Sequence, residues 1–87
     1  MRVNVLYFAK IRELVGVEQE VFEVQGRLVE LLRAVKGKYE GIGKIVDGIL
    51  EGNGDTAVAV NQDIVRDYSY ELCDGDEVAF IPPISGG

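Results

Sequence analysis

The spacing of hydrophobic and polar residues predicts two strands near the start of the chain. Residues 3–9 read Val-Asn-Val-Leu-Tyr-Phe-Ala, a β-branched and aromatic stretch without Gly or Pro, which predicts a strand. Apolar positions within residues 10–15 suit one helical turn, and Gly16 would close it. Strand character resumes in residues 18–25, where alternate apolar residues share one face. The short turn between the two strands would allow them to pair antiparallel.

From Gly26 the hydrophobic period becomes that of an amphipathic helix. Five apolar side chains at i, i+3, i+4, i+7 and i+11 share one face: Leu28, Leu31, Leu32, Val35 and Tyr39. Four charged side chains face outward: Arg27, Glu30, Arg33 and Lys36. This pattern predicts the one main helix, with Gly26 as its N-cap and Gly41 as its C-terminal stop. Residues 42–54 look irregular, with a short helical turn packed against the core.

The C-terminal half predicts short strands separated by turns. Residues 56–61 are typical of a third strand, and residues 64–66 of a shorter one. Residues 68–72 would connect them to a tight turn at residues 74–76, after which residues 77–81 form the last strand. The order strand, strand, helix, strands predicts an α+β fold, a mixed sheet with one main helix packed across it. If the first and last strands lie side by side in parallel, the chain leaves the sheet from its centre.

The stretch after the last strand is the most unusual part of the sequence. It reads Pro82-Pro83-Ile84-Ser85-Gly86-Gly87. Two prolines remove two backbone donors, so the sheet must stop there and the chain must leave extended. Glycines without a Cβ can enter a channel that is too narrow for side chains. Such a tail delivers its terminal carboxylate, which ATP can convert to an acyl-adenylate that a thiolate or an amine can displace.

Composition narrows the function classes. The 87 residues suit a single domain, 1–87, with 82–87 as a protruding tail. Without histidine, imidazole base catalysis and most zinc sites are excluded, and residues 74–77 lack the spaced ligands of a calcium loop. We therefore expect no metal and no cofactor bound by the chain itself. Cys73, the single cysteine, is interpreted as a small buried apolar residue.

Charge and hydropathy limit the partners. The net charge is −6, from nine basic and fifteen acidic residues, and no Lys or Arg cluster suits nucleic acid. The acidic balance would suit protein partners with basic docking surfaces, or would merely keep a small protein soluble. No apolar run approaches about 18 residues, so we expect no membrane partner and a cytoplasmic location.

Three stretches, residues 6–16, 59–62 and 72–87, together resemble a known family in order over nearly the whole length. The family is that of the small, sulfur-carrying subunits of molybdopterin synthase, which are β-grasp proteins related to ubiquitin. The last stretch is the most specific, because it joins an acidic turn, a strand, Pro-Pro and a terminal Gly-Gly. The main helix and residues 40–54 match the family only in pattern.

The resemblance implies a mechanism for the tail. An adenylating enzyme of the ubiquitin-activating type would use ATP to adenylate Gly87, and a sulfur donor would convert it to a thiocarboxylate. The loaded tail would enter the large subunit of molybdopterin synthase and give its sulfur to a pyranopterin precursor. Gly86 would permit threading, and Pro82 and Pro83 would limit the entropy lost on insertion.

The resemblance also implies a partner interface. Its residues are Phe8, Arg12, Ile64, Phe80 and Ile81. Phe8 and Phe80 would fit burial in the core equally well, and Arg12 would fit either an interfacial acid or an ordinary solvated position. Ile81 stands where some members of the family have an aromatic residue.

Three other functions fit the same tail. A sulfur carrier for thiamine or tRNA thiolation would use the same adenylate, although thiamine carriers tend to be shorter and lack the Pro-Pro-Ile-Ser approach. A ubiquitin-like modifier would join Gly87 to lysines of other proteins. A plain binding module with an incidental tail would keep its function when Gly86 and Gly87 are deleted.

Overall fold

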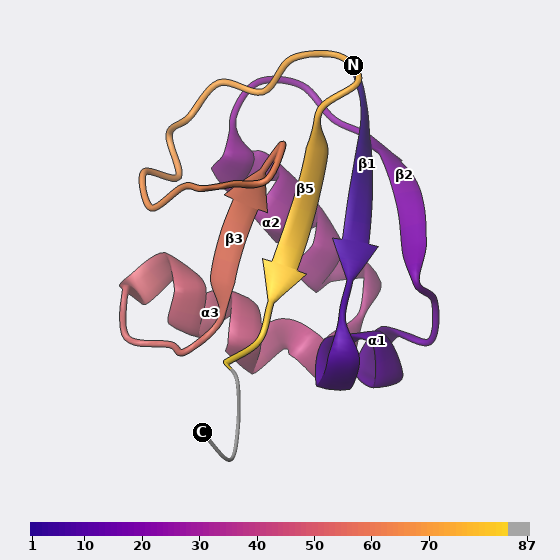
Figure 1. The fold of residues 1–87 in the computed structure, drawn as a ribbon, viewed down its shortest axis with the longest axis vertical. Coiled ribbons are helices and arrows are strands. Elements are labelled where there is room, and N and C mark those ends of the chain that lie inside the picture. Colours follow the sequence, from indigo (N-terminus) through magenta and orange to yellow (C-terminus); the bar gives the residue numbers. More distant parts are fainter. Residues whose placement is uncertain (84–87) are drawn as a thin grey trace.

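The protein folds as a mixed five-stranded sheet with its helices on one face (Figure 1). The computed structural model describes residues 1–83, so the predicted tail residues Ile84, Ser85, Gly86 and Gly87 lie outside the described residues. The elements in chain order are β1 (Arg2–Tyr7), α1 (Ala9–Val15), β2 (Gln19–Glu23), α2 (Leu28–Lys38), the 3₁₀ helix η1 (Glu40–Ile42), α3 (Gly43–Glu51), β3 (Ala57–Val60), β4 (Asp63–Ile64) and β5 (Glu77–Ile81).

The last strand is the middle strand of the sheet. The strand order is β2-β1-β5-β3-β4, in which β1 and β5 are parallel and the other pairs are antiparallel. Tyr7 of β1 stands beside Phe80 of β5, and Ala57 of β3 stands opposite Ile81. The predicted pairing of the first and last strands is therefore confirmed, and the chain leaves the sheet from its centre.

The predicted main helix supplies one side of the core. The apolar face of α2 packs on the inner face of the sheet, where alternate strand residues point inward. The helix contributes Leu28, Leu31, Leu32 and Val35, and the strands contribute Val3, Val5, Tyr7, Val58, Val60, Val78 and Phe80, all of them buried. The α+β class and the ubiquitin-like β-grasp arrangement are both confirmed.

The helix boundaries differ from the prediction. The N-cap of α2 is Arg27 rather than Gly26, which instead has a φ of +94° in the turn before the helix. The helix ends at Lys38, because Tyr39 has extended backbone angles, and Gly41 lies within η1. Residues 43–51 form the regular helix α3 where the sequence predicted irregular structure with a single helical turn.

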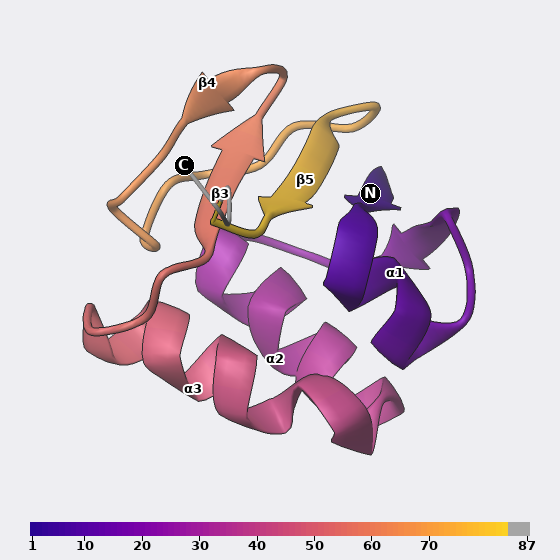
Figure 2. The same cartoon turned by 60° about the horizontal axis from the view of Figure 1, so that its bottom comes forward.

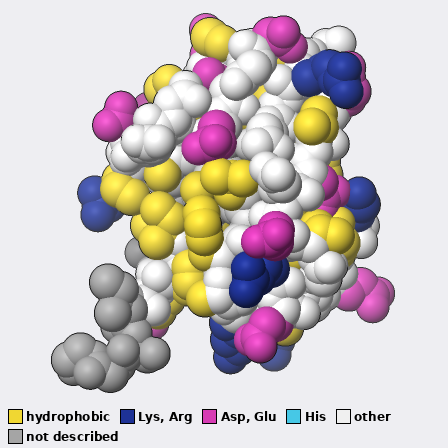
Figure 3. Space-filling view, turned by 45° about the vertical axis from the view of Figure 1, so that its right-hand side comes forward, with side chains coloured by type: hydrophobic (Ala, Val, Ile, Leu, Met, Phe, Trp, Pro, Cys, Tyr) yellow, Lys and Arg dark blue, Asp and Glu magenta, His cyan; other side chains and the backbone are white. Residues whose placement is uncertain are grey.

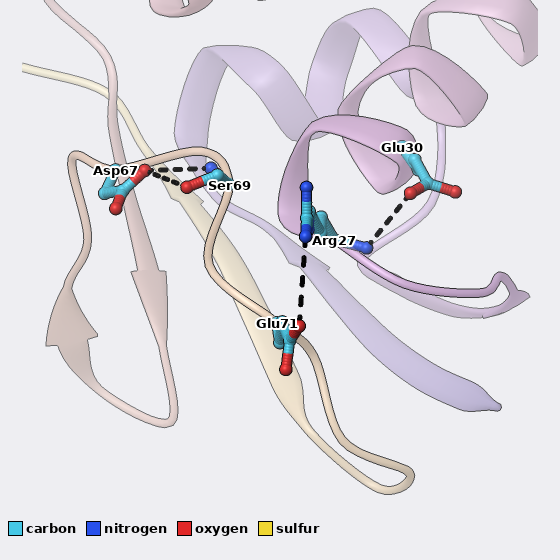
Figure 4. Close-up of polar contacts among 5 residues, drawn as sticks. All are labelled: Arg27, Glu30, Asp67, Ser69 and Glu71. Carbon is cyan, nitrogen blue, oxygen red and sulfur yellow. Dashed lines mark hydrogen bonds and ion pairs between the residues drawn. The ribbon is translucent and has the colours of Figure 1, made fainter.

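A loop after β4 holds the start of α2. The carbonyl oxygens of Tyr70 and Tyr68 accept the N–H groups of Leu28 and Val29 at 2.9 and 2.8 Å, which satisfies donors that the helix itself leaves free. Two further contacts support this junction (Figure 4): Arg27 lies 4.0 Å from Glu71, and the backbone N–H of Arg27 donates to Glu30. Asp67 closes the loop by accepting both hydrogen bonds of Ser69.

The prediction that Cys73 is buried is wrong. Its side chain is exposed, and it precedes the predicted turn at Asp74. The neighbouring Leu72 is 4% exposed and takes the place in the core, so Cys73 points the other way. Asp76 accepts the backbone N–H of Cys73 at 2.8 Å and holds this turn in shape.

Candidate functional site

The predicted tail begins at the end of the central strand. The ladder of β5 stops at Ile81, and the next two residues are Pro82, which is half-buried, and Pro83, which is exposed. Proline cannot donate a ladder hydrogen bond, so the sequence itself ends the strand there. We call Ile81, Pro82 and Pro83 the tail root. The strands β1 and β3 pair with β5 on either side, which gives the tail root a rigid base.

Next to the tail root, the outer face of the sheet carries an apolar patch (Figure 3). Register places Leu6, Ala79, Ala59 and Ile64 in one row across four strands. Phe8 and Ile81 follow Leu6 and Ala79 by two residues, so they lie on the same face, between this row and the tail. Three of these side chains are well exposed: Phe8 at 45%, Ile64 at 48% and Ile81 at 37%. We define the apolar patch as Leu6, Phe8, Ala59, Ile64, Ala79 and Ile81. Large exposed apolar side chains gathered on one face are typical of a protein docking surface.

Phe80 is not part of this patch. Its side chain is fully buried, and its ring stacks on that of Tyr7 with centroids 5.9 Å apart. Because neighbouring residues of a strand point to opposite faces, Ile81 is outward while Phe80 is inward. The sequence allowed Phe80 either burial in the core or contact with a partner. Burial in the core is correct, and contact with a partner is wrong. Phe80 instead fixes the end of the strand from which the tail leaves.

Arg12 lies beside Phe8 at the edge of the patch. Both side chains line a hollow of about 250 Å³ between α1 and the start of β2, together with Leu6 and Glu18. Arg12 donates to Glu18 at 3.1 Å, and both side chains are more than half exposed. An exposed pair of this kind contributes at most about 1 kcal/mol, so Arg12 can leave Glu18 at little cost.

Glu20 organises a polar cluster on the inner side of the sheet, under the end of β1. Its carboxylate accepts hydrogen bonds from Tyr7, Tyr39 and Lys38, the last at 2.5 Å. Burial opposes ionisation of Glu20, but the hydrogen bonds from Lys38 and Tyr39 outweigh it and lower the pKa of the carboxyl group. Burial, reinforced by Glu20, raises the pKa of Tyr7 far above its ordinary value. Local patterns in the sequence do not predict this cluster, because the three donors lie 13 to 19 residues from Glu20 along the chain.

A second hollow, of about 350 Å³, lies on the helical side of the tail root. We call it the tail-root hollow. Its lining residues are Lys10, Ile11, Lys44, Ile45, Gly48, Gly54, Asp55, Thr56, Pro82 and Pro83. No sequence motif points to Lys10 or Lys44, because only the fold brings residues of α1 and α3 together at this point.

Residues 1–83 were searched for membrane-spanning helices and for clusters of metal ligands. None of the helices in this part of the chain has the length and apolarity needed to cross a bilayer. These residues also bring together no group of three His, Cys, Asp or Glu side chains that could hold a metal ion.

The mixed sheet, the helix across it and the central last strand define the class as a ubiquitin-like β-grasp protein. The chain belongs to the ThiS family, whose model matches residues 5–87. It is 39% identical over 85 residues to the molybdopterin synthase sulfur carrier subunit of Escherichia coli, a match that covers 98% of this chain and 99% of the relative.

Solved structures give the same result. A putative molybdopterin converting factor, subunit 1, from Pyrococcus furiosus has a TM-score of 0.80 and 31% identity, covering 97% of this chain and 99% of that one. The second structure is a protein–protein complex of subunits 1 and 2 of the molybdopterin-converting factor from Helicobacter pylori. It matches with a TM-score of 0.72 and 29% identity over the full length of both chains.

Proposed function

We propose that this chain is the sulfur carrier of a molybdopterin synthase, acting as a single domain in molybdenum cofactor biosynthesis. The observation that carries the proposal is the central position of β5, whose end passes into Pro82 and Pro83 beside an exposed apolar patch. A rigid strand, a stiff dipeptide and a docking surface together suit the delivery of a chain end into another protein. Relatives that match over nearly their whole length carry the name molybdopterin synthase sulfur carrier subunit, which supports this choice.

The reacting group would be the carboxylate of Gly87. An adenylating enzyme of the ubiquitin-activating type would bring ATP, and a carboxylate oxygen would attack its α-phosphorus and release pyrophosphate. A sulfur donor would then attack the acyl carbon and displace AMP, so that sulfur replaces one oxygen as a thiocarboxylate. The chain contains no histidine, so it supplies no imidazole base for these steps. The chemistry therefore belongs to the partners, and the carrier supplies position.

The large subunit of the synthase would cover the apolar patch and receive the tail. Burial of Ile64, Ile81 and Phe8 would supply binding energy at about 25 cal/mol for each Å² of apolar surface removed from water. Pro82 and Pro83 restrict the chain before binding, so fewer conformations are lost when the tail enters its channel. Gly86 would leave room for the backbone in a narrow passage, and the sulfur on Gly87 would pass to the pyranopterin precursor. We place these steps in the cytoplasm.

Extending the chain by one alanine after Gly87 tests this proposal. The added residue moves the reactive carboxylate past the catalytic centres of both partners, so sulfur transfer should fall to background while the unfolding midpoint stays unchanged. Transfer would be measured as formation of molybdopterin by the reconstituted synthase. One extra alanine before Met1, at the end of the sheet opposite the tail, provides a length control that leaves Gly86 and Gly87 at the C-terminus. Full activity of the extended chain would rule out the carboxylate mechanism.

A further inference from the structure

The tail root is bordered by two different surfaces. The apolar patch lies on the sheet face that carries no helix, whereas the tail-root hollow is lined by residues of α1, α3 and the segment before β3. Figure 2 shows where these elements lie in the fold. Pro82 and Pro83 line the hollow directly. A protein that encloses the tail must therefore contact this hollow as well as the patch.

The hollow carries an unusual charge for this chain. Lys10 and Lys44 are exposed, and neither forms an ion pair with the residues that the structure describes. Four other cations do form such pairs: Arg12, Arg27, Lys36 and Lys38. With Asp55 as the one carboxylate in its lining, the hollow has two positive charges against one negative, in a chain whose net charge is −6. The lining of the hollow thus differs in sign from the chain as a whole.

The floor of the hollow is apolar. Ile45, which is half-buried, and Ile11, which is buried, line it together with the two prolines. A lining that combines apolar side chains with two lysines suits an acidic side chain, whose methylene groups would contact the apolar residues while its carboxylate pairs with a lysine. A basic side chain would meet two positive charges there, and Asp55 would offset only one of them.

We propose that the tail-root hollow docks an acidic segment of the large synthase subunit, located at the mouth of the channel that receives the tail. This inference rests on the proposed function, and it adds a second contact, of opposite character, to the apolar patch. Opposite charges steer an encounter over longer distances than apolar contact does. On an acidic carrier, one cationic hollow beside the tail would turn the correct end toward the channel.

Charge reversal with a matched control tests the proposal. K10E/K44E reverses the two lysines of the hollow, and R2E/R33E reverses two exposed arginines that also lack an ion pair among residues 1–83. Arg2 begins β1 at the end of the sheet opposite the tail root, and Arg33 lies on α2. Both variants have the same net charge, so a difference between them reports where the charge lies.

Association with the large subunit would be followed by stopped flow at low salt. We expect the association rate of K10E/K44E to be about tenfold below that of R2E/R33E. The two rates should converge at about 1 M salt, where the screening length is only about 3 Å. Unfolding midpoints measured on both variants establish that each is folded.

Three results would overturn the inference. Equal association rates for the two variants at low salt would show that the hollow is not contacted. Faster association of K10E/K44E would show that the channel mouth is basic. A loss confined to adenylation by the activating enzyme, with large-subunit binding intact, would assign the hollow to that partner instead. Failure of the proposed function would be seen in the wild-type chain, which would then not bind the large subunit. Failure of the inference alone would leave wild-type binding intact.

Discussion

At the scale of single residues, Glu20 links an edge strand to the helical layer. It belongs to β2, and it accepts hydrogen bonds from Tyr7 of β1 and from Lys38 at the end of α2. Its side chain is only 13% exposed, so its carboxylate depends on these donors rather than on water. The sequence predicted α2 and the strands but not this contact, because a glutamate in an alternating strand is usually solvated.

Replacing Glu20 by glutamine should destabilise the fold in a pH-dependent way. The pKa of Glu20 is lower in the folded chain, so its ionised form stabilises the fold above the unfolded pKa, and that contribution is lost as the pH falls through the folded pKa. We expect Glu20→Gln to lower the free energy of unfolding by about 2 kcal/mol at pH 7. Urea denaturation across the acid range should show the wild type and the variant converging.

Glu23→Gln provides the matched control. Glu23 lies on the same strand, is exposed, and forms no ion pair with the residues described by the structure. Its replacement should change the unfolding free energy by less than about 0.5 kcal/mol. A difference between the Glu20 variant and the wild type that stays constant down to the lowest pH would contradict the ionic account.

At the scale of elements, the sequence predicted what local patterning determines. The strands, the main helix and the turn closed by Gly16 follow from side-chain spacing, and all of them are present. Helix α3 was missed because Gly43 and Gly48 lower the helix propensity of this segment, and two more glycines, Gly52 and Gly54, lie within three residues of its end. Tertiary packing overrides this weakness, since α3 buries Val46 and Ile49 in the core.

The end of α3 depends on contact between two glycine backbones. The N–H of Gly54 donates to the carbonyl oxygen of Gly48 at 3.2 Å, and a Cβ on Gly54 would lie 3.1 Å from the carbonyl carbon of Gly48. Gly54→Ala should therefore lower the free energy of unfolding by about 1 kcal/mol or more, because backbone must move to relieve the contact. Thermal or urea unfolding measures this loss.

Gly37→Ala should have the opposite sign. Gly37 lies within α2, and a Cβ there would meet no atom within 4 Å. The substitution should raise the unfolding free energy by about 0.5 to 1 kcal/mol, because alanine loses less conformational entropy in a helix. Destabilisation by Gly37→Ala, or none by Gly54→Ala, would show that these two backbone environments are misassigned.

At the scale of the whole molecule, successive residues of each strand point to opposite faces of the sheet, so one face forms the core and the other carries the apolar patch. The sequence identified the exposed Phe8, Ile64 and Ile81 through the resemblance, but it could not distinguish them from the buried Phe80. Alternation determines that a strand has two faces, whereas only the position of the helices determines which face is buried. The tail-root hollow could not be predicted for the same reason, since α3 itself was not.

The apolar patch should contribute to partner binding and not to folding. Ile81→Ala and Ile64→Ala should each weaken binding to the large subunit about tenfold while changing the unfolding free energy by less than about 0.5 kcal/mol. Val21→Ala is the control, because Val21 is 52% exposed on β2, two strands away from the tail root. Titration calorimetry measures the affinities. Equal losses for Val21→Ala and Ile81→Ala would contradict the location of the patch.

The intact mass of the chain shows whether Gly87 becomes a thiocarboxylate. The protein would be incubated with ATP, a sulfur source and its activating enzyme, and the product would be mapped by fragmentation. We expect a mass gain equal to the replacement of one oxygen by sulfur, located at Gly87 and absent when ATP is omitted. An unchanged mass together with conjugates between Gly87 and lysines of other proteins would contradict it, because the chain would then be a modifier rather than a sulfur carrier.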